Sequence, residues 1–169
     1  GFFPGSTIGN LEPGEAVAFL RRAHAALGDG SCFLMGADLR KDPSVLIPAY
    51  DDAAGVTAAF NRNLLVRLNR EAGGGFDPMA FQHRAIWNDA ESRIEMHLVS
   101  NADQTVMVAG RAVHFARGET IHTENSYKHT SEAMLALARA AGWTPETMWT
   151  DPAGLFAVYL FQGRDDRGA

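Results

Sequence analysis

The polar side chains best suited to bind a small ligand are concentrated between Gly118 and Lys128, in the stretch GETIHTENSYK. Two carboxylates, an amide and several hydroxyl groups surround one isolated apolar residue, Ile121. Such groups together can satisfy both the donors and the acceptors of a polar ligand. The composition by itself favours a solvated loop, and a loop that grips a small polar molecule is the alternative.

The sequence contains no convincing motif for metal binding or for covalent catalysis. HExxH and HxH spacings do not occur among the histidines, which are His24, His83, His97, His114, His122 and His129. Cys32 is the only cysteine, so it can form neither a zinc knuckle nor an intrachain disulfide. His97 shares a strand face with Arg93 and Glu95, which predicts a solvated polar face. We therefore expect no metal ligand.

The segment Gly5-Ser6-Thr7-Ile8-Gly9 resembles a nucleophile elbow only loosely, because its spacing is not G-x-S-x-G. It also lacks the lysine of a P-loop. A bare turn and a ligand-binding turn remain equally open for this segment, and no residue is predicted to act as a covalent catalyst.

Length and composition favour one globular domain, or one with a small insertion. The 169 residues are 46% hydrophobic and 21% charged, and the net charge is −5. That charge and the lack of a Lys/Arg cluster argue against nucleic acid, and no apolar run approaches a membrane span. A single cysteine suits the cytoplasm. The opening Gly1-Phe2-Phe3-Pro4-Gly5 leads us to interpret the chain as a fragment, with trimming of a short leader as the alternative.

The first part of the chain predicts a parallel sheet. Phe2–Phe3 has the character of a buried strand end, and residues 13–27 carry apolar side chains at helical spacing. The nearly continuous apolar run 31–38 predicts a strand that is buried on both faces. Strand, helix and strand form a βαβ unit, and the charged end at Asp38 lies where open α/β sheets bind ligands.

The pattern changes after residue 42. Helices are predicted at 43–50 and 53–71, the second with an apolar stripe of Val56, Ala59, Phe60, Leu64, Leu68 and Ala72. Alternating strands follow at 93–99, 104–108 and 112–115, with Gly110 in a tight turn. We interpret residues 43–130 as an inserted α+β substrate-binding subdomain between two parts of one core.

The core resumes at residue 131. A helix is predicted at 131–141 with Ser131 as its N-cap, followed by strands at 146–151 and 155–161 and a polar tail from 163. Residues 1–42 and 131–169 would thus form one α/β core.

Five stretches occur in the order found in one known family: PGSTIGN, PAYDDAAGVTAAFNRNLL, ESRIEMHLVS, GETIHTENSYK and WTDPAGLFAVYLF. Together they resemble the histidine-specific methyltransferases of ergothioneine biosynthesis, over almost the whole chain. The resemblance implies the C-terminal part of a Rossmann-like methyltransferase sheet. It also implies S-adenosylmethionine-dependent methylation of the α-amino group of L-histidine to its trimethyl betaine.

The resemblance also assigns site residues. Asn10 and Tyr50 match residues that hold the substrate carboxylate, while Glu124 and Ser126 match residues that hold the imidazole ring, with Asn125 between them. The family's glycine-rich cofactor turn and the acidic residue after its second strand are not found in this sequence. No cofactor-binding residue is therefore assigned, and the chain alone is expected to be inactive.

Two other functions remain open. The chain could be a non-catalytic module that binds an amino acid or a partner, which the missing glycine-rich turn favours. It could also belong to a methyltransferase for another amino acid, although Glu124 with Ser126 favours histidine. Because an open sheet exposes an edge strand, a homodimer through that edge is a further expectation.

Overall fold

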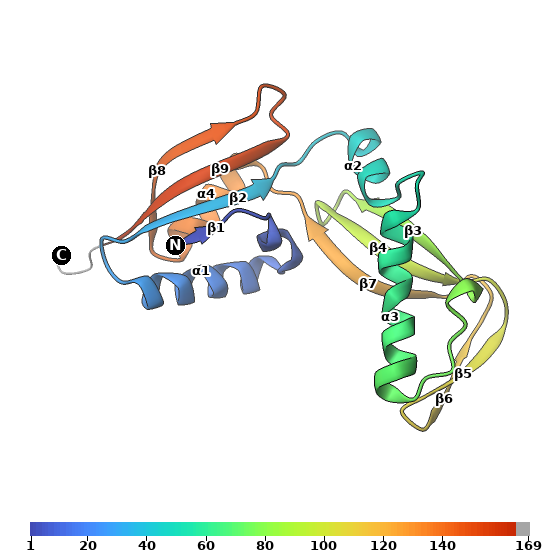
Figure 1. The fold of residues 1–169 in the computed structure, drawn as a ribbon. Coiled ribbons are helices and arrows are strands. Elements are labelled where there is room, and N and C mark those ends of the chain that lie inside the picture. The colour runs from blue at the N-terminus through green and yellow to red at the C-terminus, as the bar shows by residue number, and fades with distance from the viewer. Residues whose placement is uncertain (165–169) are drawn as a thin grey trace. The chain divides into compact units, whose positions relative to one another are not determined.

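The computed structural model describes residues 1–164, which form two compact units (Figure 1). Unit 1 comprises Gly1–Lys41, Asp89–Arg93 and the described part of Asn125–Ala169. Unit 2 comprises Asp42–Asn88 and Ile94–Glu124. The predicted polar tail lies largely outside the described residues. No helix in the described part of the chain combines the length and the apolar character that a membrane span requires.

Unit 1 is built on a four-stranded sheet with the order β1-β2-β9-β8. Strand β1 (Phe2–Phe3) pairs in parallel with β2 (Cys32–Asp38), as the predicted βαβ unit requires. Strand β9 (Phe156–Gly163) runs antiparallel to both β2 and β8 (Trp143–Thr150). The closing strand pair predicted from the sequence therefore does complete the sheet.

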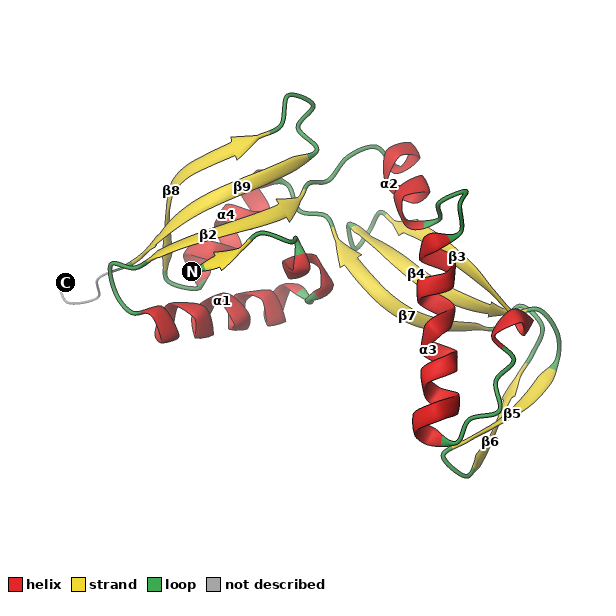
Figure 2. Cartoon of the chain, viewed as in Figure 1, coloured by secondary structure: helices red, strands yellow, loops and turns green. Residues whose placement is uncertain are grey.

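Two helices pack against this sheet, α1 (Pro13–Leu27) and α4 (Ser131–Ala140) (Figure 2). Their inward residues join a core in which Leu20 and Trp143 are fully buried. The indole Nε1 of Trp143 donates to the carbonyl of Leu20 at 2.9 Å, so the one polar atom of this side chain is satisfied. The N-cap of α4 was predicted one residue too late, since the hydroxyl of Thr130 accepts from the amide of Ala133.

Unit 2 contains most of a three-stranded sheet with the order β3-β4-β7. Its strands are β3 (Phe81–Asn88), β4 (Arg93–Ser100) and β7 (Thr120–Tyr127), and a separate hairpin joins β5 (Gln104–Val108) to β6 (Arg111–Phe115). The hairpin and its turn at Gly110, where φ is 72°, confirm the prediction.

Two strands of this sheet were not predicted. The sequence indicated a loop over Gly118–Lys128, but Thr120–Tyr127 forms strand β7. Strand β7 lies at the edge of its sheet, so only one of its sides pairs with another strand, and most of its side chains are polar. Strand β3 alternates buried and exposed residues from Phe81 to Ile86, a pattern that the sequence analysis missed.

Two helices cover unit 2, α2 (Pro43–Tyr50) and α3 (Val56–Ala72). The predicted apolar stripe of α3 was wrong in the first half of the helix, whereas Leu68 does pack against the core of unit 2. Val56 and Phe60 are 69% and 68% exposed, whereas Asn61 and Leu65, one position later in each turn, are buried. A polar residue thus occupies the inward face, and the reason lies in its hydrogen bonds to the strands below.

Candidate functional site

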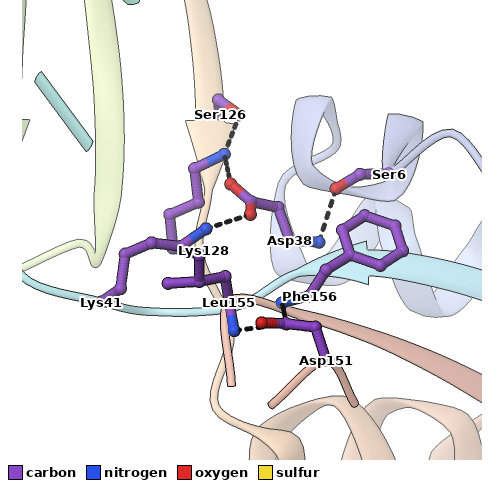
Figure 3. A network of polar contacts seen from close by, with 8 residues as sticks. All are labelled: Ser6, Asp38, Lys41, Ser126, Lys128, Asp151, Leu155 and Phe156. Atoms are coloured by element: carbon purple, nitrogen blue, oxygen red, sulfur yellow. Dashed lines mark hydrogen bonds and ion pairs between the residues drawn. The ribbon is translucent and has the colours of Figure 1, made fainter. Parts of the chain in front are cut away.

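A buried lysine organises the polar residues at the end of β2. Lys128 follows β7, and its side chain is only 1% exposed. Its ammonium nitrogen lies 2.8 Å from Asp38 Oδ2 and 2.9 Å from Ser126 Oγ, as Figure 3 shows. Lys41 pairs with the other carboxylate oxygen of Asp38. A buried ammonium is tolerated when a carboxylate and further hydrogen bonds compensate its lost hydration, and both are present here.

The contact with Lys128 determines how Ser126 can act. An ammonium group only donates, so the hydroxyl oxygen of Ser126 is the acceptor in this hydrogen bond. The hydroxyl hydrogen of Ser126 must then point away from Lys128. Any hydrogen bond that the Ser126 hydroxyl donates is therefore made to a group other than Lys128.

The loop that carries Asn10 packs closely against the same end of β7. Asn10 is exposed and ends the short 3₁₀ helix Thr7–Asn10. A Cβ atom on the preceding Gly9 would lie 2.8 Å from the carbonyl oxygen of Tyr127 and 3.6 Å from Ser126 Oγ. Only a residue without a side chain allows this approach. Asn10 and Ser126, both predicted to bind substrate, are thus carried by segments in direct contact.

The loop before Asn10 is a structural turn. Ser6 adopts a left-handed conformation with φ of 57°, and its hydroxyl accepts from the backbone amide of Asp38 at 2.8 Å. The contact joins the loop after β1 to the end of β2 (Figure 3). Because the Ser6 hydroxyl is engaged with the backbone, the geometry favours the bare turn over a nucleophile elbow.

Tyr50, the last residue of α2, is held through its backbone by a histidine that the sequence analysis did not single out. His83 has a side chain that is 1% exposed, and its Nε2 lies 2.8 Å from the carbonyl oxygen of Tyr50. Its Nδ1 lies 2.9 Å from the amide nitrogen of Asn61. Since an amide nitrogen donates, Nδ1 accepts, and the hydrogen must be on Nε2.

Asn61 and His83 explain why a polar residue occupies the inward face of α3. The amide of Asn61 also donates to the carbonyl of His97 at 3.3 Å, so this one side chain links α3 to both β3 and β4. A histidine at an inward position of the alternating run Phe81, His83, Ala85 was the available sequence signal. The two residues orient the end of α2 where Tyr50 lies.

Glu124 lies within β7 and, with Thr123, borders an open pocket below α3. The other lining residues come from one side of the helix: Phe60, Asn61, Asn63, Leu64 and Arg67. The exposed side of α3 that was predicted to be buried therefore forms a wall of this pocket. The next residue, Asn125, has a buried side-chain oxygen that accepts no hydrogen bond from any residue that the structure describes.

The five predicted substrate residues are divided between the units. Asn10, Asn125 and Ser126 belong to unit 1, whereas Tyr50 and Glu124 belong to unit 2. Glu124 and Ser126 are two positions apart in β7, the spacing at which a strand places side chains on one face. Within unit 1 the structure brings Ser126 and the Asn10 loop together, and within unit 2 it anchors the backbone of Tyr50.

The acidic residue at the carboxyl end of β2 does not fit the role of a cofactor ligand. In an open α/β sheet an acidic side chain at the carboxyl end of a strand can accept from ribose hydroxyls. Asp38 is the acidic residue at the end of β2, but Lys41 and Lys128 occupy both of its oxygens. The carboxylate of Asp38 therefore serves the internal network of unit 1 and does not fit the role of a ribose ligand.

Comparison with solved structures supports the fold. Over 97% of this chain, an S-adenosylmethionine-dependent methyltransferase from Clostridium acetobutylicum superposes with a TM-score of 0.51 at 8% identity, covering 57% of that chain. A methyltransferase from Streptomyces caelestis superposes with a TM-score of 0.51 at 13% identity, covering 97% of this chain and 56% of that one. The architecture is accordingly α/β and Rossmann-like.

Comparison with known sequences supports the family. The chain is 49% identical over 160 residues to the histidine N-alpha-methyltransferase of Mycolicibacterium smegmatis, covering 94% of this chain and 50% of that protein. The protein of the same name from Mycobacterium tuberculosis is 47% identical over 160 residues, again covering 94% of this chain and 50% of that protein. The chain thus spans about half the length of the curated relatives it matches. The family model for histidine-specific, S-adenosylmethionine-dependent methyltransferases matches residues 1–163, and the chain therefore belongs to that family.

Proposed function

We propose that the whole protein transfers methyl groups from S-adenosylmethionine to the α-amino group of L-histidine and yields the trimethyl betaine. Two relatives that carry the name histidine N-alpha-methyltransferase support this proposal at 49% and 47% identity. A relative named ergothioneine biosynthesis protein 1, from Schizosaccharomyces pombe, is 25% identical over 129 residues. The structural observation that carries the proposal is the Lys128–Ser126 contact, which holds the Ser126 hydroxyl two residues from Glu124 along β7.

An imidazole ring suits that pair of groups. A neutral imidazole has one N–H donor and one nitrogen acceptor. Glu124 would accept the ring N–H in a charge-assisted bond, and Ser126 would donate to the other ring nitrogen. An indole has no second ring nitrogen for Ser126, so tryptophan would leave this donor unsatisfied. The pair therefore favours histidine over other aromatic amino acids.

The remaining residues would orient the amino acid backbone. The side chains of Asn10 and Tyr50 can each donate a hydrogen bond to the substrate carboxylate, and the amide of Asn125 lies between the two ring-binding residues in sequence. No side chain is assigned as a catalytic base. The α-ammonium group has a reference pKa of about 8, so it can release its proton to water near neutral pH.

Positioning would be the main contribution of these residues to the rate. When bound, S-adenosylmethionine supplies an electrophilic methyl group for displacement by the amine. Holding the amine with its lone pair aligned can lower the barrier by about 7–11 kcal/mol. The cofactor's main contacts would come from residues other than those that the structure describes.

The test is steady-state methylation of histidine by the whole protein with Glu124→Ala. We expect the preference for histidine over other amino acids to fall steeply, while the affinity for S-adenosylmethionine stays within about twofold, because Glu124 would contact only the ring. Glu146→Ala is the matched control, since Glu146 is an exposed acid on β8 and does not line the pocket that Glu124 borders. Equal losses of histidine preference and cofactor affinity would contradict the proposal.

A non-catalytic amino-acid-binding module is the second candidate, because Asp38 is engaged internally and does not fit the role of a ribose ligand. Calorimetry of this chain with histidine, beside a methyl-transfer assay of the purified gene product and its intact mass, separates the two. Activity in a product well above 18.3 kDa supports the enzyme. Histidine binding without methyl transfer by the full gene product supports the module.

The location and assembly of the protein are also proposed. A single exposed and unpaired thiol, Cys32, suits a reducing cytoplasm. Strand β1 lies at an edge of the unit 1 sheet, and Phe2 on it is 72% exposed, which supports pairing between two copies of this 169-residue chain through this edge. Light scattering at high protein concentration checks the dimer, and a monomeric mass there would contradict it.

A further inference from the structure

We propose that Glu95, His97 and His122 form a binding site for a divalent transition-metal ion, with zinc as the ion that fits best. Glu95 and His97 lie two residues apart on β4, and His122 lies on the neighbouring edge strand β7. Each of the three can offer one ligand atom such that these atoms all lie within 4.8 Å of one another. All three residues belong to unit 2.

The first two ligands are already at the separation that zinc requires. Glu95 Oε2 lies 3.2 Å from His97 Nε2. Zinc bonds to nitrogen and oxygen of about 2.0–2.2 Å in a tetrahedron place neighbouring ligand atoms about 3.3–3.5 Å apart. The carboxylate and the imidazole would therefore need little movement to share one ion.

The third ligand is close and free to turn. The rings of His97 and His122 are stacked, with centroids 4.6 Å apart and planes inclined by 22°. Parallel rings do not aim their nitrogens at one point, so one ring must rotate to complete the site. His122 is exposed at the sheet edge, and an off-rotamer adjustment of about 30° costs only about 0.5–1.5 kcal/mol.

Glu95 and His97 lie in polar surroundings but are largely buried. The sequence analysis had predicted a solvated polar face for them, and that prediction was wrong. Glu95 is only 7% exposed, and its second oxygen accepts from the amide of Asn88 at 2.9 Å. Such an outer hydrogen bond fixes the orientation of a ligating carboxylate. The Nδ1 atom of His97 is buried and has no hydrogen-bond partner within the described part of the chain.

The ligand set identifies the class of ion. Two histidines and one carboxylate are a common set for zinc sites that keep a fourth position open. A small concavity beside His97, lined by Arg84, Ile86 and Thr120, leaves room for a water or an anion in that position. The sequence search missed this set because it considered HExxH and HxH, whereas here E-x-H on one strand combines with a histidine from another.

A bound ion would connect β4 to the edge strand β7. Strand β7 also contains Glu124 and Ser126. The bound ion would therefore stabilise the strand on which the proposed ring-binding residues lie. Zinc that binds the folded chain and not the unfolded one raises its apparent stability by mass action. The site therefore predicts a zinc-dependent rise in the midpoint of thermal unfolding.

The experiment is calorimetric titration of zinc chloride into the complete chain after removal of any histidine tag. We expect one zinc per chain, with affinity reduced at least about 10-fold by His122→Ala and by His97→Gln. His114→Ala is the matched control, because His114 is an exposed strand histidine of unit 2 outside the cluster. Since His122 is exposed, its replacement does not disturb the core, and circular dichroism of each variant verifies the fold.

Two further readouts make the result decisive. Cobalt(II) in place of zinc should give the strong visible absorption of a tetrahedral site in the wild-type chain and not in His122→Ala. Zinc should raise the unfolding midpoint of the wild-type and His114→Ala chains alone. The proposal is overturned if the wild-type chain takes up no stoichiometric zinc, if His122→Ala binds as tightly as wild type, or if His114→Ala loses as much affinity.

Discussion

Lys128 donates a hydrogen bond to the hydroxyl of Ser126 over 2.9 Å, and both side chains are buried. The same ammonium contacts Asp38 at the end of β2. Lys128 thereby couples the end of β7 to the carboxyl edge of the unit 1 sheet, the edge at which open α/β sheets bind their ligands. Ser126 is thus held in position by Lys128, with its hydroxyl oxygen as the acceptor of this hydrogen bond.

Replacing Ser126 by alanine should weaken the binding of histidine without harming methyl transfer once histidine is bound. One neutral hydrogen bond contributes about 0.5–1.5 kcal/mol, so KM for histidine should rise about 2- to 12-fold with a smaller change in kcat. Steady-state kinetics of the whole protein measure both constants. Ser100→Ala, a buried serine of β4 that bonds to the backbone of Ala102, is the control and should leave KM unchanged.

Asp38 and Lys128 should prove energetically coupled. Lys128→Met leaves Asp38 with Lys41 as its remaining cation, and Asp38 is 22% exposed, so we expect a loss in free energy of unfolding of about 2–3 kcal/mol. Asp38→Asn leaves a buried ammonium without its carboxylate and should cost at least as much. Urea unfolding of the chain and its variants provides the measurement.

The double variant distinguishes a coupled pair from two separate structural residues. With both charges removed, the loss should be smaller than the sum of the single losses by about 1–3 kcal/mol. Lys41→Met is the comparison for the second lysine, which is 14% exposed, and it should destabilise the chain less than Lys128→Met does. Additive losses from Asp38→Asn and Lys128→Met would contradict the coupling.

The acid sensitivity of α3 should depend on Asp52. Its carboxylate accepts from the backbone amides of Thr57 at 2.8 Å and Val56 at 3.0 Å, and these bonds lower the pKa of Asp52 from 3.8 to about 2. Because the folded-state pKa is the lower one, the stabilisation is complete above about pH 4 and is lost as the pH falls toward 2. Asp52→Asn should therefore lower the unfolding midpoint at pH 7, and the deficit should shrink between pH 4 and pH 2.

Thermal unfolding across that pH range tests the prediction. Glu146→Gln, which alters an exposed acid on β8, is the control and should show a difference from wild type that stays small throughout. A deficit of Asp52→Asn that is the same at pH 7 and pH 2 would mean that Asp52 acts through packing and not through its charge.

The sequence predicted regular elements best where hydrophobic periodicity and turn residues agree. The helix Pro13–Leu27 begins at a proline and ends before glycine, and its bounds were predicted correctly. The strand Thr120–Tyr127 was predicted as a loop because an edge strand with polar side chains has no apolar period to detect. In the first half of α3 the predicted apolar stripe was wrong, since Asn61 occupies the inward face there through its hydrogen bond to His83.

The residues of the candidate site could likewise be predicted from the sequence only in part. Resemblance to the family selected Asn10, Tyr50, Glu124, Asn125 and Ser126, but no local pattern indicates that Lys128 is buried. A lysine is almost always exposed, and the burial of Lys128 depends on its pairing with Asp38, 90 residues away in sequence, and on its hydrogen bond to Ser126. His83 and the set of Glu95, His97 and His122 likewise depend on contacts between strands that the sequence does not reveal.

The close approach of Gly9 to β7 leads to the last prediction. A methyl group on Gly9 would lie 2.8 Å from the carbonyl oxygen of Tyr127, a backbone atom that cannot turn away as a side chain would. Gly9→Ala should therefore push the Asn10 loop off β7, with a loss in free energy of unfolding of about 1–3 kcal/mol and a higher KM for histidine in the whole protein.

The matched control for Gly9 is Gly14, a glycine in the first turn of α1. A Cβ on Gly14 meets no atom of the described chain within 4 Å, so Gly14→Ala should be neutral or stabilise the chain by up to about 1 kcal/mol. Urea unfolding and histidine kinetics on both variants complete the comparison. If Gly9→Ala loses stability but keeps the wild-type KM, Asn10 does not hold the substrate carboxylate. If the free energy of unfolding and KM for histidine both stay at wild-type values in Gly9→Ala, the loop is not packed on β7 as tightly as the 2.8 Å contact requires.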